Sequence, residues 1–226
     1  GIEAGGRLHR VLSRAPLTLL MSPSSMESRL QCLLDLGVQP ESLGPVCVRS
    51  PRLLHTPLST IRRKAEWLVD AGVLPPDATP AAFGAFVDSL PDFFSLSARD
   101  GEAKLEHLES VGLSSSQAAR LIASEPAALT QPLEQLELRT AFFLQIVGGT
   151  PEELLEVPHM LTCDLMNGPM LRHAYCLTNG LQVPPTQLLT RGDVNFCDAV
   201  EGCCLDDFNA FESEGKHLSF FQGAVM

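Results

Sequence analysis

The stretch RSPRLLHTPLSTIRRKAEWLVDAGV, residues 49–73, contains the pattern that decides the fold. It has a proline and two leucines near its start, from Pro51, and a glycine near its end, at Gly72. Proline cannot continue a helix and moves the residue before it out of the α region, so it ends one helix and begins a turn. Glycine supplies the left-handed cap that stops the next helix. Between them apolar residues recur three and four positions apart, which predicts an amphipathic helix over residues 59–71.

The same unit recurs five times along the chain. Each copy starts with a proline that is followed by large apolar side chains, at Pro16, Pro51, Pro91, Pro126 and Pro158. A glycine closes an apolar-periodic segment at a nearly constant interval after each proline, at Gly37, Gly72, Gly112, Gly148 and Gly180. The intervals between successive prolines are similar as well, and this double regularity indicates a repeat architecture.

Each repeat is predicted to hold two helices. The longer one ends at the glycine, as in residues 59–71 and 101–111. A shorter one follows the glycine, over residues 41–48, 79–90, 114–124, 151–157 and 184–190. Because no such unit buries its apolar face alone, the units must stack on one another. The prediction is an all-α protein, an α-solenoid of about five repeats that forms a curved superhelix with a concave face.

The repeats define the expected domain organisation. They cover residues 15–50, 51–90, 91–125, 126–157 and 158–190. An N-terminal extension, 1–14, precedes them, and a C-terminal cap and tail, 191–226, follows, with Phe196, Phe208 and Phe211 expected to cover the last repeat. Tetratricopeptide and pentatricopeptide arrays fit less well, since the former lack internal prolines and the latter keep a stricter period.

Charge divides the chain into two parts. The net charge is −11, but residues 1–64 hold nine Lys or Arg against four acids, a net charge of +5, which leaves −16 for the rest. Affinity for a phosphate backbone comes largely from Lys and Arg, so the N-terminal half is the part suited to a polyanion. The acidic remainder suits a protein partner or solubility. No run of 18 apolar residues occurs, and no membrane partner is expected.

A cation occupies a fixed position in each repeat. It lies eight residues before the glycine in four repeats and nine before it in the other, at Arg29, Lys64, Lys104, Arg139 and Arg172. Such a series predicts a ladder that follows a phosphate backbone, although solvated helix residues would give the same spacing. The densest basic cluster comprises Arg49, Arg52, Arg62, Arg63 and Lys64. It lacks an aromatic series to stack bases, so backbone contact is predicted for it. Together the ladder and the cluster form the predicted nucleic-acid-binding set.

No arrangement of residues predicts catalysis. Nucleophile motifs, phosphate-cradling glycine loops and dinucleotide fingerprints do not occur in a persuasive setting, so neither an enzyme nor a cofactor is expected. Zinc ligation by His159, Cys163, His173 and Cys176 is disfavoured, because small buried cysteines account for that pattern better. Seven cysteines without a CxxC pair or a glycosylation sequon favour a reducing compartment.

The repeat resembles the mitochondrial transcription termination factor (mTERF) family over roughly residues 15–190. The similarity is carried by the Pro-x-Leu-Leu turns and the Leu-Gly-Val or Leu-Gly-Leu helix ends, by RSPRLL at 49–54 with RKAEWLVDAGV at 63–73, and by DVNF at 193–196. It implies repeats of helix, helix and 3₁₀ turn in a left-handed solenoid. It also implies a mitochondrial or chloroplast location. The three arginines and one glutamate of the first twenty residues are consistent with the site of transit-peptide removal.

Two functions follow. The first is a non-catalytic factor of organellar gene expression that binds the backbone of RNA or double-stranded DNA through its basic N-terminal half. The second is a structural or adaptor subunit of a large organellar assembly, such as a ribosome or another ribonucleoprotein or transcription complex, that binds mainly protein subunits through its acidic C-terminal half. An enzyme is the weakest interpretation.

Overall fold

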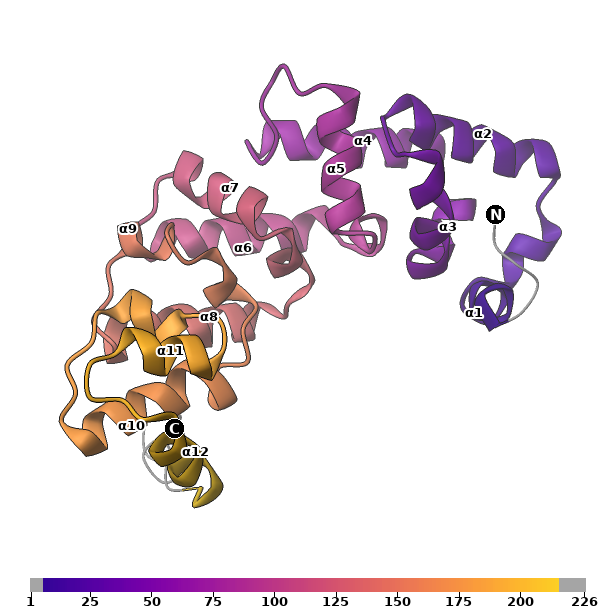
Figure 1. The fold of residues 1–226 in the computed structure, drawn as a ribbon. Helices are drawn as coiled ribbons and strands as arrows, with labels where there is room; N and C mark the ends of the chain where they lie inside the picture. The colour runs from indigo at the N-terminus through magenta and orange to yellow at the C-terminus, as the bar shows by residue number, and fades with distance from the viewer. Residues whose placement is uncertain (1–5, 216–226) are drawn as a thin grey trace. The chain divides into compact units, whose positions relative to one another are not determined.

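A computed structural model describes residues 6–215, which form α-helices joined by short 3₁₀ and π turns and contain no β-strand (Figure 1). The chain divides into two compact units, Gly1–Leu133 and Glu134–Met226, here called unit 1 and unit 2. Unit 1 contains α1 (Gly6–Arg14), α2 (Pro23–Asp35), α3 (Pro40–Arg49), α4 (Leu58–Asp70), α5 (Pro80–Ser89), α6 (Ala98–Ser110) and α7 (Ser115–Ser124). Unit 2 contains α8 (Leu133–Ala141), α9 (Pro151–Leu154), α10 (Leu171–Asn179), α11 (Asp193–Ala199) and α12 (Leu205–Ser213).

The predicted prolines begin short 3₁₀ helices between the longer ones. Four of these start on the proline itself: η1 (Pro16–Leu20), η2 (Pro51–His55), η4 (Pro126–Thr130) and η6 (Pro158–Leu161). The third, η3 (Phe93–Ser95), starts two residues after its proline. In all five repeats the residue before the proline has φ between −115° and −141° and ψ between 58° and 72°. Proline therefore excludes the α conformation there and ends the preceding helix in the same way each time.

The predicted glycines end the longer helices. Their φ values are all positive, at Gly37, Gly72, Gly112, Gly148 and Gly180, and range from 65° to 109°. Residues with a side chain rarely adopt this left-handed conformation, which is why glycine marks each repeat at the same place. The alternation of long helix, glycine stop, shorter helix and proline turn confirms the predicted all-α helical-repeat fold.

Most helices lie within a few residues of the predicted spans, and two segments differ. Residues 184–190 were expected to form a helix like the others, but they contain only the 3₁₀ helix η8 (Pro185–Leu189). Pro184 has φ of −57° and ψ of 145°, because a residue before a proline is kept out of the α conformation, so no helix begins before Pro185. The sequence pattern also did not predict the π turns η5 (Phe142–Ile146) and η7 (Met166–Met170). In η7 the proline at 169 interrupts the α-helical ladder, and a wider turn results.

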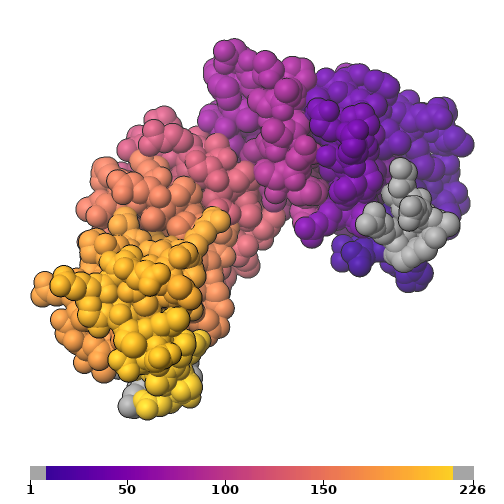
Figure 2. All heavy atoms as spheres, in the orientation of Figure 1, coloured from indigo at the N-terminus to yellow at the C-terminus, as the bar shows by residue number. Residues whose placement is uncertain are grey.

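Each unit has its own core. In unit 1 the long helices contribute fully buried residues such as Ile61, Leu68 and Leu108. The space-filling view shows the segments of unit 1 following one another in chain order, from indigo through magenta to pink (Figure 2). In unit 2, Phe208 and Phe211 of α12 pack edge-on against Tyr175 of α10, with ring centroids 5.2 and 5.6 Å apart. Phe208 and Phe211 of α12 are thus buried against α10.

Candidate nucleic-acid interface

The five cations of the predicted ladder occupy equivalent places in the structure. Each lies on the longer helix of its repeat and donates to main-chain carbonyl groups at the next 3₁₀ turn. That turn belongs to the following repeat for the first four cations and to the end of the fifth repeat for Arg172. The pairs are Arg29 with Thr56, Lys64 with Phe94 and Leu96, Lys104 with Leu129, Arg139 with Cys163, and Arg172 with Leu188 and Thr190. We call each such contact a cation clasp. All five clasps lie within one unit or the other.

The acceptor carbonyls follow a simple rule. Counted from the proline that starts each turn, they belong to the third or the fifth residue after it. Phe94, Leu129 and Leu188 occupy the third position, and Thr56, Leu96, Cys163 and Thr190 occupy the fifth. The last proline to obey the rule is Pro185, at the start of η8. The last carbonyls of a helical turn have no partner within it and carry the negative end of its dipole, so a cation is the donor best suited to them.

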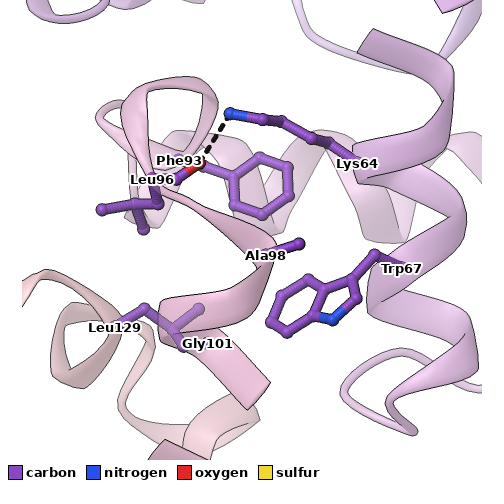
Figure 3. Close-up of a pocket in the computed structure, with 7 residues that line it drawn as sticks. All are labelled: Lys64, Trp67, Phe93, Leu96, Ala98, Gly101 and Leu129. Atoms are coloured by element: carbon purple, nitrogen blue, oxygen red, sulfur yellow. Dashed lines mark hydrogen bonds between the residues drawn. The ribbon is translucent and has the colours of Figure 1, made fainter. Parts of the chain in front are cut away.

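The clasp of Lys64 shows the packing that surrounds such a contact (Figure 3). The side chain extends from α4 across the ring of Phe93, and its Nζ donates to the Leu96 carbonyl at 2.7 Å. Beneath it the indole of Trp67 lies against Gly101 at the start of α6, where a Cβ would come within 2.5 Å of the ring. The remaining cavity has a volume of about 10 Å³, which is room for no more than a water molecule. This contact therefore joins two repeats and leaves no space for a ligand.

The lysine of the next clasp is more deeply buried. Lys104 is 4% exposed, and its Nζ donates to the carbonyl of Leu129 at the end of η4. Burial lowers the pKa of Lys104, while the nearby carboxylate of Asp100 acts in the opposite direction. Burial also lowers the pKa of Lys64. Both side chains donate to carbonyls in place of water, which offsets part of the cost of removing their charge from solvent.

In unit 2 the two clasps differ in how many of their donors are satisfied. Arg172 is 6% exposed, and Nη1 donates to the carbonyls of Leu188 and Thr190 while Nε and Nη2 donate to Oδ1 of Asp193, at 3.0 and 2.7 Å. Arg139 is 7% exposed, and its Nε donates to Cys163 at 3.0 Å, but its Nη1 has no hydrogen-bond partner among the described residues. The site of Arg172 thus provides acceptors for Nε, Nη1 and Nη2, whereas the site of Arg139 leaves Nη1 without one.

The five cations of the predicted ladder do occupy equivalent positions in successive repeats. We assign them a structural role. Lys104, Arg139 and Arg172 are buried, and the charged groups of all five cations face main-chain carbonyls. Their fixed distance from the glycine was visible in the sequence. The carbonyls that they contact were not, because spacing along one helix says nothing of the turn packed against it. Contact of these five residues with phosphate stays a prediction.

The rest of the predicted set is exposed. Arg49, Arg52, Arg62 and Arg63 all have exposed side chains, on the end of α3, on η2 and on the first turns of α4. Within residues 6–215, Arg49 alone of the four forms an ion pair, since its Nη1 lies 3.7 Å from Oδ2 of Asp92, and the Arg49 side chain is still 60% exposed. No Asp or Glu occurs between positions 42 and 65. We call the four arginines the arginine segment, and it is the most basic exposed stretch of unit 1.

The residues disfavoured as zinc ligands have other contacts. His159 Nε2 is hydrogen-bonded to the carbonyl of Leu189, the thiol of Cys163 donates to the Met160 carbonyl, and the ring of His173 packs edge-on against Phe142. Among residues 6–215 no group of three or more His, Cys, Asp or Glu side chains is placed to hold a metal ion. Within the same residues, no helix is both long and apolar enough to cross a membrane.

Comparison with known proteins agrees with this architecture. The family model described as mTERF matches residues 6–197, which is most of the chain and includes all five clasps. No curated protein matches the sequence.

Proposed function

We propose that this chain, which belongs to the mTERF family of non-catalytic, nucleic-acid-binding helical-repeat proteins of organellar gene expression, binds the phosphate backbone of RNA or DNA through its arginine segment. The observation that carries the proposal is the exposure of four arginines in a stretch, 42–65, that contains no acid. Arginine donates two parallel hydrogen bonds to a phosphate and keeps its charge at every physiological pH. Because family members are typically organellar, the proposed site of action is the mitochondrion or the chloroplast.

Phosphate contact is a better match than base reading for this surface. The single Trp of the chain, Trp67, is only partly exposed and packs its six-membered ring against Gly101. Tyr175, the single Tyr, is buried against Phe208 and Phe211. Binding that rests on arginines alone depends strongly on salt and weakly on sequence.

A salt titration tests the proposal. Fluorescence anisotropy would follow binding of labelled RNA, single-stranded DNA and duplex DNA between about 50 and about 300 mM salt, a range chosen because backbone contacts weaken steeply over it. The variant Arg52→Gln/Arg62→Gln/Arg63→Gln should bind at least about tenfold more weakly and lower the slope of log affinity against log salt by about 2.

The control keeps the same change in net charge. Arg99→Gln/Arg120→Gln/Arg191→Gln removes three exposed arginines from other helices and loops. If the two triple variants lose equal affinity, net charge alone governs binding and the arginine segment is not the site. Absence of binding by the unaltered chain at low salt would refute direct recognition.

A second function is favoured by the charge of unit 2. Residues 134–226 hold thirteen acids against four Lys or Arg, and two of those four, Arg139 and Arg172, are buried in clasps. We propose that this unit serves as an adaptor surface for a basic protein subunit of an organellar ribonucleoprotein or transcription complex. Crosslinking in native organelle extract separates the two functions, because peptides of residues 49–63 should crosslink to nucleic acid and peptides of unit 2 to protein.

A further inference from the structure

Two cysteine thiols lie against each other, one on α11 and one in the loop between α11 and α12. The Cys203 thiol donates to Sγ of Cys197, and the two sulfur atoms are 2.9 Å apart. All seven cysteines are free thiols in the structure. A disulfide has a sulfur–sulfur distance near about 2.05 Å, so the two atoms need to approach by less than about 1 Å to form one. We propose that Cys197 and Cys203 are a redox modification site that forms an intramolecular disulfide.

The loop itself holds the two sulfurs together. Cys197 is on α11, and the main-chain N–H of Cys203 donates to the Val200 carbonyl at 3.0 Å, which closes a tight turn before α12. Gly202, with φ of 85°, gives the turn the left-handed residue that it needs. No rearrangement of either helix is therefore required to bring the thiols into contact.

The two thiols differ in access, which orders the reaction. Cys203 is partly exposed, whereas Cys197 is 7% exposed. Burial first, and then the neighbouring Cys203, raises the pKa of Cys197 to about 12, so Cys197 is protonated and inert toward outside reagents. An oxidant therefore meets Cys203 first.

The oxidant that suits this geometry is a small disulfide such as glutathione disulfide. The Cys203 thiol loses its proton, and its sulfur attacks one glutathione sulfur to form a mixed disulfide, while the other glutathione leaves as a thiolate and takes up a proton. The sulfur of Cys197 then attacks Sγ of Cys203 as its own proton passes to the second departing glutathione. Two cysteine thiols lose two electrons and two protons, and one glutathione disulfide becomes two glutathione thiols.

A single proteolytic fragment reports the outcome. Trypsin cleaves after Arg191 and Lys216 and not between them, so one peptide carries Cys197, Cys203 and Cys204. The folded full chain would be equilibrated in glutathione buffers that range from reduced to oxidised and then quenched in acid. Free thiols would be alkylated with N-ethylmaleimide, and the tryptic peptides would be analysed by mass spectrometry. We expect a peptide that lacks two hydrogens and carries one maleimide, and an equilibrium constant for its formation at least about tenfold higher than in concentrated urea.

Variants identify the partners in the disulfide. Cys204 is exposed and adjacent to Cys203, and it is the competing thiol. Cys204→Ser should keep the bond with the same midpoint, and so should Cys176→Ser, which removes the other thiol near Cys203. Cys197→Ser should show a Cys203–glutathione adduct in place of the bond. The proposal is overturned if the bond persists in Cys197→Ser, which would place it between Cys203 and Cys204, or if all three cysteines stay alkylated at every ratio.

A spectroscopic signal gives a second readout. Tyr175 is the only tyrosine, and its pKa is raised first by burial and further by its contact with Cys203. Oxidation consumes that thiol, so the absorbance titration of Tyr175 should move toward lower pH in the oxidised chain. The shift should be absent in Cys203→Ser under the same buffers, because that variant has no thiol to lose at this position, and a shift of equal size there would contradict the proposal.

Discussion

A Cβ on Gly84 would lie 2.0 Å from the carbonyl oxygen of Gly37, so the start of α5 and the end of α2 meet main chain to main chain. The approach is reciprocal, because a Cβ on Gly37 would lie 1.8 Å from the carbonyl oxygen of Pro80 in the first turn of α5. Real Cβ atoms do not come so close to backbone atoms, and backbone yields less readily than the end of a side chain. Glycine is therefore required on both sides of this junction between repeats.

The first prediction is that Gly84→Ala destabilises unit 1 by about 3 kcal/mol or more, since α5 must move away from α2 to admit the methyl group. Urea denaturation followed by Trp67 fluorescence measures the change in this unit. Gly44→Ala is the matched control, because Gly44 lies within helix α3 and a Cβ there meets no atom within 4 Å. Because Pro45 follows and disfavours the α conformation of a residue with a Cβ, the gain in helix propensity is offset, and the free energy of unfolding should change by less than about 1 kcal/mol. Equal stability of the two variants would show that α2 and α5 are not in close contact.

The second prediction concerns a single clasp. Lys104→Met keeps the length and apolar stem of the side chain but removes the donor to the Leu129 carbonyl. We expect a loss of about 1.5–3 kcal/mol, the cost of leaving a buried carbonyl without its charged partner. Arg120→Met, at an exposed position on α7, should change the free energy of unfolding by less than about 0.5 kcal/mol. An unchanged urea midpoint in Lys104→Met would contradict the structural role assigned to the clasp.

The third prediction contrasts the two arginine clasps. Arg139→Lys should leave the unfolding free energy unchanged or raise it by up to about 1 kcal/mol, since a lysine needs fewer partners and the unsatisfied Nη1 is removed. Arg172→Lys should lower it by about 2 kcal/mol or more, because one Nζ cannot replace the three nitrogens that bind Leu188, Thr190 and Asp193. Thermal unfolding of both variants checks the contrast, and the opposite order would contradict it.

The fourth prediction is a loss of stability at alkaline pH. Burial raises the pKa of the Cys47 thiol to about 11, whereas a thiol in the unfolded chain ionises near about 8.5. Between these values the unfolded state releases a proton that the folded state keeps, so the thiol's contribution to stability is complete below about pH 8.5 and is lost as the pH rises toward 11. The slope is at most about 1.4 kcal/mol per pH unit for each such thiol.

The measurement is the urea midpoint from neutral pH to about pH 10.5 in Cys47→Ala and in Cys204→Ala. The first variant should show a shallower decline than the unaltered chain, and the second, which changes an exposed thiol, should not. Lys64 and Lys104 have the opposite effect on how stability changes with pH. Because their pKa values are lowered in the folded state, the folded chain releases these protons at a lower pH than the unfolded chain does, and stability rises with pH just below the ordinary lysine pKa. Parallel curves for the chain and for Cys47→Ala would show that Cys47 ionises normally.

The sequence predicted those features that depend on backbone chemistry. Pro51 permits few backbone conformations, and Gly72 permits the left-handed one that other residues rarely adopt. Their spacing alone therefore located the turns and helix ends, and the same holds in the other repeats. The position of Lys64 and its counterparts was also evident. Their function was not, since an amphipathic pattern gives the side on which a residue lies but not whether a carbonyl or solvent faces it.

Other features had no signal in the sequence. The contact of Cys197 with Cys203 depends on the turn at Gly202, and no periodic pattern covers that region. Gly84 and Gly37 lie close together, but only Gly37 belongs to the repeated proline–glycine pattern of the sequence. The glycine pair joins segments that are distant in sequence, and only the packing of neighbouring repeats brings them together. The cysteine pair depends on the path of one short loop.

The clasps also constrain where the repeats differ in length. The cation and its acceptor are separated by 27 residues in the clasp of Arg29 and by 16 and 18 in that of Arg172, yet the acceptor keeps its place after the proline. Apart from one extra residue between Arg139 and Gly148, the varying residues lie between the glycine and the next turn. These spacings predict that insertions and deletions are tolerated in that segment, and that a change of even one residue between a proline and its acceptor carbonyl would shift the junction out of register.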